Sequence, residues 1–82
     1  RLDYDRQGYI YFASRQYRRM NAEDRKRIRS LCRDCGGEYW QALLAYVTTD
    51  ASVTELSLKH HLSPSTLHRV VRRYYEQFPE KF

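Results

Sequence analysis

Two helix-start signals stand close together in the last third of the chain. Ser52 is followed three residues later by Glu55, the spacing of a capping box, in which each side chain bonds a backbone amide of the other residue. Ser63 is followed directly by Pro64, which suits an N-cap and the first position of a second helix. Almost no residues remain for a connection, so the two helices must cross sharply. We therefore predict helices over residues 53–61 and 64–77.

The residues around this predicted corner follow a recurrent order. Ser57 is a small residue where the two helices would touch, His61 takes the turn position, and Leu62 is an aliphatic residue before the Ser63 cap. His61 would need a positive φ, which histidine tolerates better than most residues other than glycine. The segment resembles the helix-turn-helix family of bacterial and phage regulators. Family members usually have glycine at the position of His61 and an apolar residue at that of His60. A plain hairpin of two helices remains the alternative.

The resemblance implies a DNA-reading role for the last helix, which in this family enters the major groove. Carried over position by position, the residues that would face base edges are Ser65, His68, Arg69 and Arg72. Those that would contact phosphate are Lys59, Ser63, Thr66 and Arg73. Arg69 is the best candidate for a bidentate contact with guanine. Pro64 takes a position where many relatives have a long polar base reader, so one direct contact is expected to be missing.

Upstream of the corner, apolar residues recur at helical spacing in further segments. One stripe predicts a helix over residues 9–20; apart from the polar Gln16 its members are apolar or aromatic, and they are Tyr9, Phe12, Ala13, Gln16, Tyr17 and Met20. Asn21 is a good N-cap for the next helix, which we place over residues 22–35. Gly36 and Gly37 would end it, one of them in the left-handed conformation.

A helix predicted over residues 38–48 is apolar around much of its circumference. One stripe consists of Trp40, Leu43, Leu44 and Val47, and a second of Tyr39, Ala42 and Tyr46. Such a helix is buried on more than one side, so we expect it at the centre of the domain. With 82 residues, the chain fits one domain with a small core. We predict an all-α fold of about five helices, in which residues 1–8 are a disordered lead-in and residues 9–82 a single helix-turn-helix domain.

Charge is arranged in blocks along the chain, whose formal net charge is +5. Residues 15–33 contain eight basic and two acidic residues, and residues 34–58 contain four acidic residues and no basic one. Residues 59–73 contain four basic residues and no acidic one. Basic blocks of this kind favour polyanions such as DNA. A solvated surface of mixed charge is the simpler alternative.

Cys32 and Cys35 have the spacing of a zinc knuckle, and His60 and His61 would supply two further ligands. Both cysteines nevertheless lie on the apolar stripe of their predicted helix, where a free thiol behaves as a small hydrophobic group. We therefore expect a buried reduced pair, no metal and no cofactor. Reduced thiols fit an intracellular protein. Together with the resemblance, this suggests the bacterial cytoplasm or a phage-infected host.

The sequence favours a binding protein over other classes. No Ser/His/Asp or paired-carboxylate arrangement surrounds the three histidines, and no glycine-rich phosphate loop is present. No run of about 18 apolar residues is present either, so we expect neither an enzyme nor a membrane protein. The favoured function is sequence-specific binding of double-stranded DNA, by a transcription regulator or by its DNA-binding domain.

Two other functions remain open. Helices before a C-terminal helix-turn-helix are similar to region 4 of bacterial sigma factors and to the phage regulators that resemble it. One alternative keeps this fold as a protein-interaction module that binds RNA polymerase or a sigma factor. The other is the DNA-recognition domain of a recombinase, transposase or small terminase.

Oligomeric state is a separate question. Homodimers on paired half-sites are common in the family. The candidate contact is the aromatic stripe of Tyr9, Phe12 and Tyr17. The alternative is that this helix folds back to cover the small core.

Overall fold

The computed structural model describes residues 3–80, and helices make up most of this part of the chain. The elements are, in order, α1 (Tyr4–Arg15), the 3-10 helix η1 (Tyr17–Arg19), α2 (Ala22–Gly36), the 3-10 helix η2 (Gly37–Tyr39), α3 (Trp40–Thr48), α4 (Val53–His60) and α5 (Pro64–Gln77). No strand occurs within the described residues. The all-α class predicted from the sequence is therefore confirmed.

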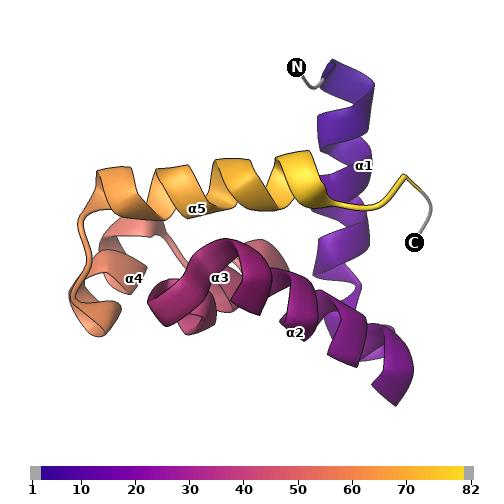
Figure 1. Cartoon of the computed structure of the whole chain (residues 1–82), viewed down its shortest axis with the longest axis horizontal. Helices are drawn as coiled ribbons and strands as arrows, with labels where there is room; N and C mark the ends of the chain where they lie inside the picture. Colours follow the sequence, from indigo (N-terminus) through magenta and orange to yellow (C-terminus); the bar gives the residue numbers. More distant parts are fainter. Residues whose placement is uncertain (1–2, 81–82) are drawn as a thin grey trace.

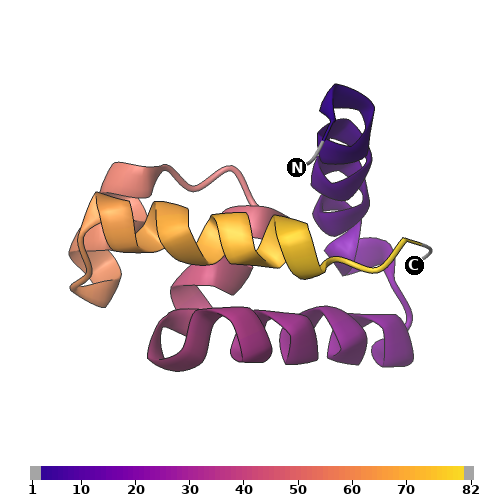
Figure 2. The same ribbon diagram turned by 45° about the horizontal axis from the view of Figure 1, so that its top comes forward.

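The helices are arranged around α3, which contacts each of α1, α2, α4 and α5. This central position agrees with the prediction from its two apolar stripes. α2 and α5 pack against each other and lie side by side in Figure 2. α4 lies at one end of α5, whereas α1 crosses the other end and extends beyond it (Figures 1 and 2). The two ends of α5 therefore have different surroundings.

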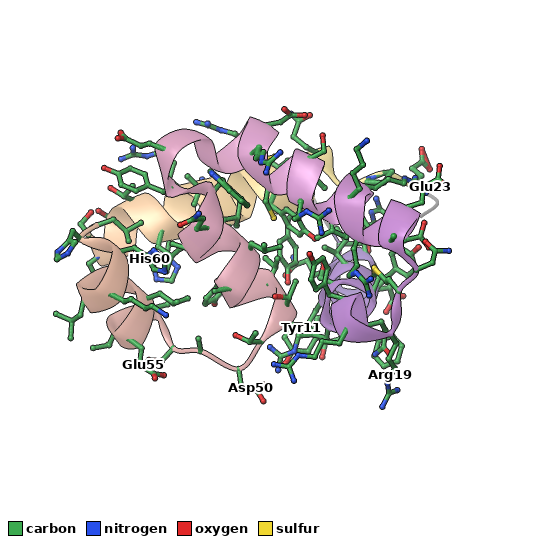
Figure 3. The ribbon with its side chains drawn as sticks, turned by 90° about the horizontal axis from the view of Figure 1, so that it is seen from below. Tyr11, Arg19, Glu23, Asp50, Glu55 and His60 are labelled. Carbon is green, nitrogen blue, oxygen red and sulfur yellow. The ribbon has the colours of Figure 1, made fainter. Side chains whose placement is uncertain are left out.

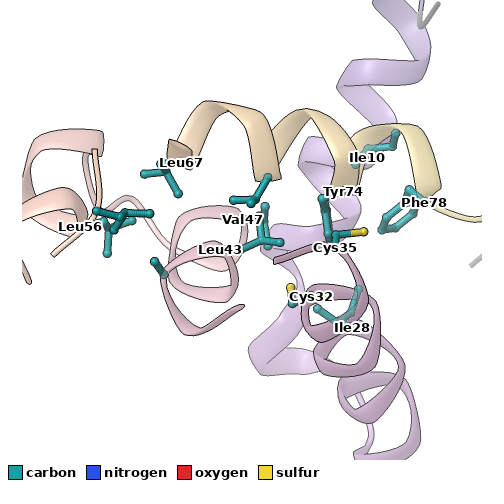
Figure 4. Packing of buried hydrophobic residues seen from close by; sticks show 13 residues of the cluster. Ile10, Ile28, Cys32, Cys35, Leu43, Val47, Leu56, Leu67, Tyr74 and Phe78 are labelled. Atoms are coloured by element: carbon teal, nitrogen blue, oxygen red, sulfur yellow. The ribbon is translucent and has the colours of Figure 1, made fainter. Parts of the chain in front are cut away.

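The core lies where these helices meet, and Figure 4 shows its packing. Each α-helix contributes to it, with Ile10 from α1, Ile28, Cys32 and Cys35 from α2, Ala42, Leu43 and Val47 from α3, Leu56 from α4, and Leu67, Val70 and Tyr74 from α5. Both cysteines are free thiols and buried, as predicted. Burial raises the pKa of the Cys32 thiol to about 12, so this group stays protonated at neutral pH.

The prediction for the N-terminal segment is wrong. α1 begins at Tyr4, inside the segment 1–8 that lacks periodicity and was expected to be disordered; residues 1 and 2 lie outside the described residues. Asp3 is the N-cap of α1, because its carboxylate accepts a 2.7 Å hydrogen bond from the backbone amide of Arg6. α1 also ends earlier than predicted, at Arg15, and η1 follows it.

The buried side of α1 also differs from the predicted stripe. Ile10 and Ser14 are its buried residues, whereas Tyr9 and Phe12 are 42% and 66% exposed. The hydroxyl groups of Ser14 and Tyr74 share a hydrogen bond of 2.7 Å in the core, which connects α1 to α5. A prediction from hydropathy places the aromatic rings in the core and the serine outside. It misses Ser14 because it takes no account of the hydrogen-bond partner that makes a buried serine stable.

A second contact holds α1 at the C-terminal end of α5. The Arg6 guanidinium donates hydrogen bonds of 2.8 Å to the carbonyl groups of Phe78 and Pro79. It also lies over the rings of Tyr9 and Phe78. A cation beside the carbonyl groups at a helix C-terminus is favourable. α1 therefore covers one end of α5, and the start of α5 lies away from it (Figure 1).

The other predicted helices agree closely with the structure. α5 has the predicted bounds, α4 ends one residue earlier and α2 one residue later than predicted. The segment predicted to start a helix at residue 38 forms η2 first, and α3 begins at Trp40. Gly37 is the C-cap of α2 and has a positive φ of 55°, but its ψ of −126° lies outside the left-handed region, so the left-handed conformation predicted for one of the two glycines is not found.

Candidate nucleic-acid interface

Helix caps and a left-handed residue form the corner between α4 and α5. At the start of α4, the capping box of Ser52 and Glu55 is complete, with both hydrogen bonds at 3.1 Å. At its end, His61 has φ 57° and ψ 48°, the left-handed conformation predicted for this position. Within residues 3–80, no other residue except glycine has a positive φ. The chain then enters α5 through the buried Leu62 and the Ser63 cap.

Three hydroxyl groups gather at the start of α5. The Ser63 hydroxyl accepts a 3.2 Å hydrogen bond from the backbone amide of Thr66, as an N-cap does. It also lies 2.9 Å from the Thr66 hydroxyl and 3.2 Å from the Ser65 hydroxyl. Ser63 and Ser65 are exposed, and Thr66 is half-buried. The positive end of the helix dipole makes this first turn suitable for a phosphate group.

The residues predicted to face bases are all exposed on the outer side of α5; they are Ser65, His68, Arg69 and Arg72. The opposite side packs into the core, and its buried residues are Leu67, Val70 and Tyr74. Residues three or four apart share one side of a helix, so Ser65, Arg69 and Arg72 form one row. The structure thus brings the two arginines together at the surface, as the sequence pattern predicts.

Glu76 lies in the same row and was not singled out from the sequence. It is exposed and comes four residues after Arg72, so it lies one turn further along α5. The four-residue spacing from Arg72 is the signal that would have identified it. Its carboxylate restricts the basic surface of α5 to the part of the helix before it.

The two basic residues predicted to contact phosphate have different surroundings. Lys59 is exposed near the end of α4, beside the corner. Arg73 is exposed as well, but its guanidinium donates a 3.2 Å hydrogen bond to the carbonyl group of Cys35. A cation is favourable at that place, because Cys35 belongs to the last turn of α2. Arg73 therefore supports the packing of α5 on α2, a role that the sequence pattern does not reveal.

The structure does not bring the four residues of the zinc alternative together. Cys32 and Cys35 lie in the core, whereas His60 is half-buried and His61 exposed at the end of α4 (Figure 3). Within residues 3–80, no group of three or more His, Cys, Asp or Glu side chains is placed to hold a metal ion.

The hydroxyl group of Ser57 is buried and forms no hydrogen bond with another group of the described residues. An unsatisfied buried hydroxyl costs about 1–3 kcal/mol, and alanine has nearly the same volume without that group. Ser57→Ala should therefore raise the free energy of unfolding by about 1 kcal/mol, measured by urea denaturation. Ser57→Leu is the control that tests whether the site has room for a larger side chain. It should lower the free energy of unfolding by about 1–3 kcal/mol. A loss of stability in Ser57→Ala would show that the hydroxyl does have a partner.

Comparison with protein-family models gives no match, and neither a curated protein nor a solved structure matches the chain. Among the described residues, no helix has both the length and the apolar character that crossing a bilayer requires. The site is therefore defined by its own geometry. It consists of an exposed basic side of α5, a capped first turn and a left-handed corner that joins α5 to α4.

Proposed function

We propose that α4 and α5 form a helix-turn-helix and that the chain binds double-stranded DNA sequence-specifically. It would act as a transcription regulator or as the DNA-binding domain of one. The observation that carries this proposal is the division of α5 into a buried apolar side and an exposed side with Arg69 and Arg72. A helix that is packed on one side and exposed on the other fits a major groove, which is about 12 Å wide.

In the proposed complex, α5 reads the bases and the corner holds the backbone. Arg69 would donate two hydrogen bonds to the O6 and N7 atoms of one guanine. Arg72 lies almost one turn further along the same row, where it would meet a neighbouring base pair. The first turn of α5 with Ser63, together with Lys59, would hold phosphate groups and fix the register of the helix on the duplex.

The arrangement of the helices supports this orientation. In Figures 1 and 2, the start of α5 meets the corner with α4, whereas α1 crosses its C-terminal end. Recognition helices contact base edges with their N-terminal residues, and in α5 these residues lie away from α1. Glu76 follows them along the helix, so its carboxylate lies away from the part of α5 that would be deepest in the groove.

Titration of duplex DNA at several salt concentrations tests the proposal. The logarithm of the binding constant should fall with the logarithm of the salt concentration, with a slope of about −0.9 for each phosphate that is neutralised. Three or four basic contacts would give a slope of roughly −3 to −4. Selection from a pool of random duplexes should then enrich one site.

Two results would separate this proposal from the other functions. Absence of salt-dependent duplex binding would contradict it and favour a module that binds RNA polymerase or a sigma factor. If a site is selected, transcription from a promoter that carries this site should depend on the protein. No such dependence would favour the DNA-recognition domain of a recombinase, transposase or terminase.

A further inference from the structure

α1 has large aromatic side chains on the side that faces away from the core. Tyr4, Tyr11 and Phe12 are 89%, 54% and 66% exposed. Tyr4, Gly8 and Phe12 follow one another at four-residue spacing, so they form one row along the helix. In Figures 1 and 2, the N-terminal half of α1 extends beyond the other helices. The side chains of Tyr4 and Phe12 in this row are therefore largely exposed.

Gly8 leaves a notch in the middle of this row. A Cβ atom placed at Gly8 would meet no heavy atom within 4 Å, so packing inside this chain does not require a glycine. Its φ is not positive either, so the backbone does not require one. Glycine weakens the middle of a helix relative to alanine. Glycine at position 8 therefore lowers the stability of α1 in the isolated chain. A side chain of another molecule that packs into the notch would offset this loss.

The charge on α1 changes sign along its length. Asp3 and Asp5 lie at its N-terminal end, where the basic residue Arg6 is engaged with the carbonyl groups of Phe78 and Pro79. Arg15 is the last residue of α1, and Arg18 and Arg19 follow in η1. Two such helices side by side in the same direction would bring acid against acid and base against base. In opposite directions, the acidic end of each helix lies beside the basic end of the other. The charge pattern thus complements a second copy of itself.

We infer that the row of Tyr4, Gly8 and Phe12 is a contact surface for a second copy of this chain, with the two α1 helices antiparallel. The Phe12 ring of each copy fills the notch at Gly8 of the other. Asp5 comes three residues before Gly8 and Arg15 three residues after Phe12, so this register brings Asp5 level with Arg15 of the second copy. Both copies use the same surface, which gives a closed dimer with two-fold symmetry.

Arg15 is held in a position that suits this contact. Its guanidinium donates a hydrogen bond to the Thr49 carbonyl, forms an ion pair with Asp50, and lies 4.9 Å from the centre of the Tyr11 ring. Figure 3 shows Tyr11 on the same side of the molecule as Asp50. A guanidinium has five N–H donors, and Thr49 and Asp50 do not use all of them, so a carboxylate from a second copy would bind a remaining donor.

Sedimentation of the protein without DNA tests this inference independently of the proposed function. The wild-type protein should change from monomer to dimer as its concentration rises to about 1 mM. The expected affinity is low because one row of side chains on a single helix forms a contact smaller than the ~800 Å² per partner of a stable interface. Gly8→Gln should stay monomeric, since its side chain fills the notch. The same variant should melt at a higher temperature than the wild type, since glutamine is a better helix former. Phe12→Ser should also stay monomeric.

Two further variants serve as controls. Leu58→Ser removes an apolar side chain of α4 that is 74% exposed, and it should associate as the wild type does. Asp5→Asn tests the direction of the helices, because it weakens an antiparallel pair and strengthens a parallel one. The inference is overturned by a wild-type protein that stays monomeric, by dimers of Gly8→Gln and Phe12→Ser, or by tighter association of Asp5→Asn.

Discussion

Replacing both Arg69 and Arg72 by alanine should weaken binding to the preferred duplex by about 2–6 kcal/mol. The reason is that each guanidinium is expected to contribute about 1–3 kcal/mol through base contacts. Arg69→Ala alone should lose about 1–3 kcal/mol and relax the preference at one base pair. Both residues are exposed, so thermal unfolding should be nearly unchanged. Fluorescence anisotropy with the selected duplex and with a random one measures affinity and preference together.

The matched control removes the same charge from another part of the surface. Arg18 and Arg19 are exposed in η1, and Figure 3 shows Arg19 at the opposite end of the molecule from His60. The variant Arg18→Ala/Arg19→Ala should lose much less affinity, and the loss should be the same for all sequences. Equal losses in the two double variants would contradict a base-reading role of α5.

Residues that contact phosphate should respond differently from those that read bases. Lys59→Ala should weaken all sequences alike and lower the salt slope by about one. The sequence alone predicts the same for Arg73→Ala, but the hydrogen bond of Arg73 to the Cys35 carbonyl adds a loss of stability. Lys59→Ala should therefore melt as the wild type does, and Arg73→Ala at a lower temperature. Lys59→Ala is the cleaner measure of a phosphate contact.

The corner between α4 and α5 could be predicted from the sequence because its signals are local. The capping box at Ser52, the cap at Ser63 with Pro64 after it, and the turn at His61 each involve residues a few positions apart. Their backbone conformations follow from neighbouring side chains and hardly depend on the rest of the fold. Both the bounds of α5 and the left-handed residue were therefore predicted correctly.

The placement of α1 could not be predicted in the same way, because tertiary contacts decide it. The buried Ser14 depends on the Tyr74 hydroxyl, 60 positions along the chain. Arg6 contacts the end of α5, from the segment that lacks hydrophobic periodicity. An aromatic stripe usually marks a buried side, but here the core takes Ile10 and leaves Phe12 exposed.

The same distinction applies to the candidate interface. Helical periodicity predicts that Arg69 and Arg72 are exposed, since Leu67, Val70 and Tyr74 fix the opposite side of α5. It does not predict the hydrogen bond of Arg73, because that depends on where α2 ends relative to α5. A sequence pattern thus gives the exposed side of a helix, and only the packed structure shows which charged residues on it are engaged within the chain.

Tyr74→Ala should lower the free energy of unfolding by about 3–5 kcal/mol, the largest loss we expect from a single change in the core. Tyr74 is fully buried, and its ring centre lies 5.6 Å from that of Phe78. Single domains are stable by only about 5–15 kcal/mol in total, so this variant should be close to unfolding at room temperature. Circular dichroism during urea denaturation measures the change.

The hydroxyl group of Tyr74 can be tested separately from its ring. Tyr74→Phe leaves the buried Ser14 hydroxyl without its partner and should lower the free energy of unfolding by about 1–3 kcal/mol. The double variant Ser14→Ala/Tyr74→Phe should regain most of this loss, because no unsatisfied hydroxyl remains. Tyr75→Phe, at the half-buried neighbour, is the control and should change stability by less than about 0.5 kcal/mol. Additive losses in the double variant would mean that the two hydroxyl groups act independently, and Arg6 would then be the main polar link between α1 and α5.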